Sequence, residues 1–138
     1  MNVKGYHDEV KRQVGETVRL SGISPKTAGD QERLILGAYC FGVINGYSLE
    51  QKAEPVHVQA AVISAAVQFL GYAPETAAQL CDFLIQSTNR DFHPTVYAII
   101  HRGMEGYYLL KENKRQALTR DVQQIVEVVA NSSEDDDE

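Results

Sequence analysis

The side chains with the greatest chemical potential in this sequence lie between residues 90 and 108. At intervals of four residues, this stretch places His93, Tyr97, His101 and Glu105. If the stretch is helical, these side chains form a line along one face, because residues four apart are neighbours on a helix. Two imidazoles, a phenol and a carboxylate in such a line indicate either a buried polar network or a surface that recognises a partner.

The spacing of the two histidines argues against a metal site. Histidines that share an ion on one helix are typically four residues apart, whereas His93 and His101 are eight apart, roughly 12 Å along a helix axis. The sequence also lacks a nucleophile motif and a phosphate-binding loop. We therefore expect no metal and no cofactor. A small helical ligand-binding protein or enzyme that uses His93, His101 and Glu105 is the alternative, with His101 and Glu105 as an oriented general base.

The beginning of this stretch is typical of a capped helix. Pro94 suits the first helical position, where its missing N–H is not needed. His93 or Asp91 would then accept a hydrogen bond from a free backbone N–H of the first turn. For Asp91, His93 and Thr95 we favour helix capping over contact with a ligand.

The end of the stretch combines charged and aromatic residues. Arg102 lies three residues before Glu105, so the two could form a solvated ion pair. Arg102 could instead be a charged anchor in an interface. Tyr107 and Tyr108 are adjacent and point to different faces, so we expect at least one of them near the surface.

The elements that position these residues are predicted to be helices. Apolar residues recur at intervals of three and four, and three prolines stand where helices would begin. The pattern predicts helices over residues 6–20, 28–47, 55–71, 74–86, 94–111 and 115–130. Short connections favour antiparallel neighbours, so we expect an all-α fold, a compact bundle of about six helices that forms a single domain over residues 1–131.

The second predicted helix is apolar on almost every side, which is typical of the central helix of a bundle. Gly37, Gly42 and Gly46 interrupt it, and each costs about 1 kcal/mol relative to alanine. That cost is tolerable where another helix backbone packs closely. A regulatory scaffold that oligomerises through this helix, for example as a homodimer, is a further alternative.

The net charge of −6 belongs to the C-terminus. The last five residues are all acidic, and the rest of the chain has fourteen acids and thirteen bases. We expect residues 132–138 to be a disordered acidic tail, with an arm that engages a cationic partner as the alternative. A body so close to neutral, in a chain whose isoelectric point is near 5.2, is unlike a nucleic-acid-binding surface.

Cys40 and Cys81 each lie in an apolar pattern without a second cysteine or histidine at metal-ligand spacing. We expect both to behave as small buried hydrophobic residues. The sequence has no secretory signal and no apolar run long enough to cross a bilayer, so we expect a cytoplasmic protein without membrane contact.

Three parts of the sequence, within residues 30–110, together resemble one known family. They are Phe41-Gly42-Val43-Ile44-Asn45-Gly46, Phe69-Leu70-Gly71-Tyr72, and the stretch that contains His93-Pro94-Thr95, Ile99-Ile100-His101-Arg102-Gly103 and Gly106-Tyr107. The last is the most specific. The sequence resembles the small all-α immunity proteins of bacterial polymorphic toxin systems, immunity protein family 48.

This resemblance implies a non-enzymatic protein that binds a cognate protein toxin and neutralises it by steric occlusion. Partner-binding candidates then lie on the fifth predicted helix. The matching run supplies His93, Thr95, His101 and Arg102, and the row of polar and aromatic residues on the same helix adds Glu105, Tyr107 and Tyr108.

Overall fold

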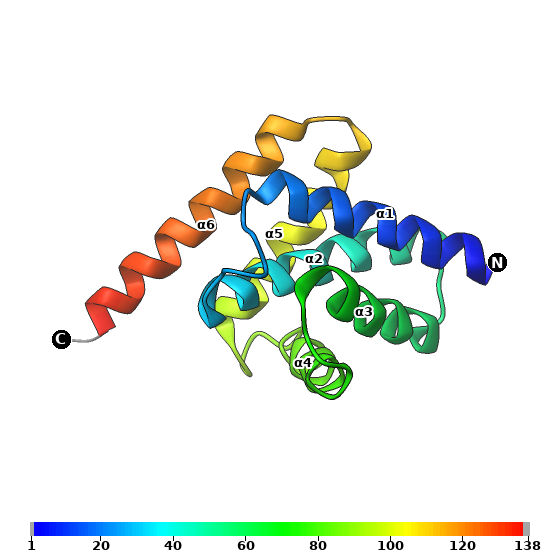
Figure 1. Ribbon diagram of the computed structural model, residues 1–138, viewed down its shortest axis with the longest axis horizontal. Helices are drawn as coiled ribbons and strands as arrows, with labels where there is room; N and C mark the ends of the chain where they lie inside the picture. Colours follow the sequence, from blue (N-terminus) through cyan, green and yellow to red (C-terminus); the bar gives the residue numbers. More distant parts are fainter. Residues whose placement is uncertain (1, 137–138) are drawn as a thin grey trace.

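The computed structural model describes residues 2–136, with side chains as far as residue 132. The described chain forms six α-helices and no strand (Figure 1). They are α1 (Val3–Ser21), α2 (Asp30–Gln51), α3 (Pro55–Leu70), α4 (Pro74–Gln86), α5 (Pro94–Lys111) and α6 (Arg115–Asp136). The predicted all-α fold is confirmed.

Proline and glycine mark several of the helix ends, as the sequence predicted. Pro55, Pro74 and Pro94 are the first residues of α3, α4 and α5. Gly22 and Gly71 follow α1 and α3 with φ angles of 74° and 77°, in the left-handed region that glycine adopts without a steric penalty.

Two helices run past their predicted ends. α2 continues to Gln51 instead of residue 47, and α6 continues to Asp136 instead of residue 130. The polar residues at 131–133 carry no apolar signal for a helix, yet the backbone remains helical there. The last two residues of the predicted acidic tail, and the side chains from residue 133 onward, lie outside the described residues.

Helix α2 is the central element of the bundle, as its apolar composition predicted. It packs against α1, α3, α5 and α6. Leu36, Tyr39 and Val43 on this helix are fully buried. Helix α6 runs along the edge of the molecule, and its C-terminal end extends beyond the other helices (Figure 1).

The backbones of α2 and α5 meet where Gly42 lies against Gly103. A Cβ atom on Gly42 would lie 2.7 Å from the Cα of Gly103, and one on Gly103 would lie 2.9 Å from the carbonyl carbon of Tyr39. Real Cβ atoms do not approach so closely. The close approach of another helix backbone, predicted from the glycines of α2, is therefore confirmed at Gly42.

The other two glycines of α2 also face neighbours in the same chain. Gly46 lies against the ring of Tyr107, and Gly37 lies at ordinary contact distance from Leu70 and Leu80. The glycine positions through which we considered oligomerisation are thus covered by α3, α4 and α5, and they are not available to a second copy.

Candidate functional site

The N-terminus of α5 is capped by His93. Its Nδ1 atom accepts a hydrogen bond of 3.2 Å from the backbone N–H of Val96, as the capping interpretation predicted. The imidazole also packs edge-on against the ring of Phe83, with 5.6 Å between ring centroids. Asp91 lies in the preceding turn, where its own N–H donates to the side chain of Asn89. His93 therefore fixes the start of α5.

Arg102 does not pair with Glu105, and this prediction was wrong. Its guanidinium donates from Nε (2.9 Å) and Nη2 to the carboxylate of Asp121 on α6, and from Nη2 to Gln124 (3.0 Å). This pair was not predictable from the sequence, because Asp121 lies on the next helix and becomes a neighbour only when α5 and α6 pack.

Asp121 also joins α6 to the centre of the bundle. The hydroxyl of Tyr39 on α2 donates a hydrogen bond of 2.9 Å to Asp121. The Tyr39 side chain is 0% exposed, so this carboxylate satisfies a donor that water does not reach. Tyr39, Arg102 and Asp121 thus form a polar network that connects α2, α5 and α6.

This network predicts that stability falls at high pH. Burial, together with the negative charge of Asp121, raises the pKa of the Tyr39 hydroxyl above its ordinary value of 10.0. The unfolded chain then loses this proton while the folded protein keeps it. The stabilisation is complete below about pH 10 and is lost as the pH rises from there toward the folded pKa. Tyr107 acts in the same direction, because burial and Glu50 raise its pKa as well.

Urea unfolding from about pH 8 to about pH 11 measures this loss of stability. The Tyr39→Phe variant should show a smaller decrease than the wild type over the same interval. Tyr108→Phe is the control for loss of a tyrosine hydroxyl outside this network, because Tyr108 is exposed. Equal decreases in the wild type and Tyr39→Phe would contradict the assignment.

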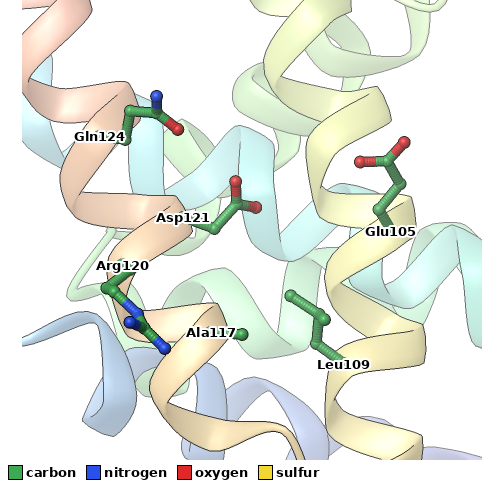
Figure 2. Close-up of a pocket in the computed structure, with 6 residues that line it drawn as sticks. All are labelled: Glu105, Leu109, Ala117, Arg120, Asp121 and Gln124. Atoms are coloured by element: carbon green, nitrogen blue, oxygen red, sulfur yellow. The ribbon is translucent and has the colours of Figure 1, made fainter.

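His101 is exposed on the outer side of α5, and its ring lies against Tyr97 with 4.3 Å between centroids. Among the described residues, the predicted pair of His101 with Glu105 is not formed. Glu105 instead faces α6 across a shallow depression that Leu109, Ala117, Arg120, Asp121 and Gln124 also line. Figure 2 shows Glu105 and Asp121 pointing into this space from opposite sides.

Tyr107 and Tyr108 differ in exposure, as predicted. Tyr107 is buried, and its hydroxyl donates a hydrogen bond of 2.5 Å to Glu50 at the end of α2. Lys111 approaches the same carboxylate at 3.1 Å. Tyr108 is 47% exposed. Tyr107 therefore fastens α5 to α2, whereas Tyr108 remains accessible to a partner.

A larger depression, of about 660 Å³, lies where the beginnings of α2 and α5 meet the second half of α6. We call it the α2–α5–α6 groove. Its lining is mainly apolar and includes Leu34, Ala98, Ile99, Ile125, Val128 and Val129. His93, Thr95 and Arg102 line it as well. The predicted candidates pointed to this region, but the contributions of Leu34 and Val128 were missed. Their apolar character was visible in the sequence, but their proximity was not.

The seven predicted binding residues are therefore distributed over several places. His93, Thr95 and Arg102 line the α2–α5–α6 groove, Glu105 faces the depression between α5 and α6, and the remaining three lie elsewhere on α5. His93, His101 and Glu105 do not converge on one cavity, which the enzyme alternative requires. Within residues 2–136, no group of three or more His, Cys, Asp and Glu is placed to hold a metal ion.

None of the six helices, over the described residues, combines the length and the apolar character that crossing a membrane requires.

Comparison with known proteins identifies a family. A family model described as Immunity protein 48 matches residues 6–130, a range that includes at least part of every helix. No curated protein and no solved structure matches the chain.

Proposed function

Because the chain belongs to the Immunity protein 48 family, we propose that it binds a cognate bacterial toxin and neutralises it by steric occlusion, without catalysing a reaction. The family match over residues 6–130 carries this proposal. The proposed setting is the cytoplasm of a bacterium with a polymorphic toxin system, where the bound protein keeps the toxin from its target.

The chemistry of the described residues supports a binding role. Several polar side chains with catalytic potential are occupied in holding the fold: His93 caps α5, Asp121 joins Tyr39 to Arg102, and Tyr107 is bonded to Glu50. Exposed on α5, in contrast, are Thr95, His101, Glu105 and Tyr108. Accessible polar and aromatic groups on a firmly packed helix are suited to contact with another protein.

The proposal predicts that the toxin loses activity in proportion to the amount of this protein that is bound to it. The toxin encoded beside this gene should be inactivated fully at about equimolar ratio, because steric occlusion requires one bound molecule for each toxin. Titration of the purified toxin with this protein, followed by its remaining activity, measures the ratio. Size-exclusion chromatography with light scattering should show the complex, and on the free protein it also tests the homodimer alternative.

Two outcomes would contradict the proposal. Complete protection at a small fraction of equimolar protein would indicate that the chain modifies the toxin catalytically. Absence of both a complex and protection would exclude this toxin as the partner. A matched control is the toxin of an unrelated immunity system, whose activity should be unchanged at every ratio.

A further inference from the structure

The α2–α5–α6 groove exposes apolar surface that the chain itself does not cover. Val128 on α6 is 56% exposed, although a valine in the body of a helix is usually placed against a neighbour. Leu34 on α2 is partly exposed and Ala98 on α5 is exposed, while Ile99 and Ile125 form a buried floor. Removing such apolar surface from water provides a driving force for a partner to bind there.

The dimensions of the groove suit a short segment of a second protein. On α5 its lining extends from His93 to Arg102, and on α6 from Gln124 to Ser132. Eight or nine residues of helix correspond to roughly 12–13 Å along the axis. This length accommodates about two turns of a partner helix, which would place two or three side chains of one face between the walls.

The charges around the groove are predominantly negative. Gln31, which lines the groove, lies between exposed Asp30 and Glu32, and Glu127 is exposed beside Val128. Beyond Ser132, the last residue of the lining, the sequence continues with one serine and five acids.

The bases in this region do not offset these acids. Arg102 lines the groove, but its charge is neutralised by Asp121. Arg33 keeps its positive charge over the ring of Tyr72, whereas the charge of Arg90 is balanced by the adjacent Asp91. One uncompensated base therefore stands against three acids, Asp30, Glu32 and Glu127. A partner segment with positive charges beside its apolar side chains is therefore favoured over a neutral or an acidic segment.

From this apolar lining and its acidic border, we propose that the α2–α5–α6 groove binds a toxin segment whose apolar side chains are flanked by lysine or arginine. This inference rests on the proposed function and specifies the chemistry of the partner. The apolar side chains of the segment cover Val128, Leu34 and Ala98, and its positive groups lie toward Asp30, Glu32 and Glu127.

The Val128→Lys variant tests the site directly. It places a positive charge on the exposed apolar wall, and it should weaken binding of the toxin at least tenfold. Val56→Lys is the matched control, since Val56 is 63% exposed on α3 and does not line the groove. Both variants replace exposed side chains, so circular dichroism should show unchanged helix content and similar thermal unfolding.

A second variant tests the charges without altering the apolar lining. Replacing Asp30, Glu32 and Glu127 together by Asn, Gln and Gln should weaken toxin binding about threefold or more at low salt. The affinity of this variant for the toxin should depend less on salt concentration than that of the wild type, because salt screens mainly the charges that were removed. Unchanged affinity with an unchanged salt dependence would contradict the electrostatic part.

A pair of designed peptides tests the groove without the toxin. One is an amphipathic helix of about fourteen residues with leucine on one face and lysine on its borders, and the other has glutamate in place of lysine. Fluorescence anisotropy should show tighter binding of the lysine peptide by wild-type protein, and loss of this preference in Val128→Lys but not in Val56→Lys.

The outcomes separate this inference from the proposed function. If the toxin binds the wild type and Val128→Lys equally well, the groove assignment is overturned while neutralisation by binding stands. If the toxin does not bind the wild type, the proposed function fails for that toxin. The two peptides alone then test the groove assignment. Equal binding of both peptides, or binding of neither, would then overturn the groove assignment.

Discussion

Replacing Gly103 with alanine should reduce the free energy of unfolding by about 2–3 kcal/mol, although alanine favours a helix over glycine by about 1 kcal/mol. The new Cβ atom would be forced against the backbone of α2, 2.9 Å from the carbonyl carbon of Tyr39 and 3.0 Å from the Cα of Gly42. Backbone cannot rotate away as a side chain can, so α2 and α5 must separate. Gly42→Ala should have a similar effect for the reciprocal reason.

Urea unfolding measures this effect, with the slope of the transition compared between variants. Gly37→Ala is a matched control on the same central helix, because its Cβ atom would lie 3.6 Å from Leu70 and Leu80, at ordinary contact distance. It should leave stability unchanged or raise it by up to about 1 kcal/mol. If Gly103→Ala is as stable as Gly37→Ala, the two backbones are not in the contact described here.

Replacing Asp121 with alanine should destabilise the protein by about 2–3 kcal/mol. The hydroxyl of Tyr39 would remain fully buried without its acceptor, and Arg102 would lose its carboxylate partner. The guanidinium contributes the smaller part, because 39% of the Arg102 side chain is exposed and water screens its charge.

A double-mutant cycle separates these contributions. Tyr39→Phe removes the buried hydroxyl, so Asp121→Ala should cost about 1 kcal/mol less in that background than in the wild type. Asp8→Ala is the control for loss of a surface ion pair, since Asp8 pairs with Lys4 where both side chains are largely exposed, and it should change stability by less than about 0.5 kcal/mol. Additive effects of the Tyr39 and Asp121 substitutions would contradict the network.

The sequence predicted those parts of the fold that depend on local signals. Prolines and glycines marked helix ends because their backbone preferences act at single residues, as Pro94 and Gly71 illustrate. The apolar composition of α2 identified the central helix, and Gly42 predicted a close helix contact. The end of α6 was missed, because helix continuation through polar residues has no apolar periodicity to reveal it.

The candidate site was predictable only in part, because its important relations are between helices. The sequence identified α5 as the helix with the candidate residues and His93 as its N-cap, and the structure confirms the cap. It offered Glu105, the nearest acid along the chain, as one possible partner of Arg102, whereas packing brings Asp121 closer. The groove depends on how α2, α5 and α6 converge, so Leu34 and Val128 could not be connected before that arrangement was known.

The glycine contact between α2 and α5 also bears on the kinetics of recognition. Direct contact of two backbones leaves α5 little freedom to slide or turn, so the backbone that carries its outward side chains is fixed before a partner binds. A backbone fixed in this way loses little further conformational entropy on association, and the cost that remains is the ordering of the exposed side chains. It also needs no slow rearrangement of this helix after the first encounter, and under the proposed function this favours fast capture of a toxin.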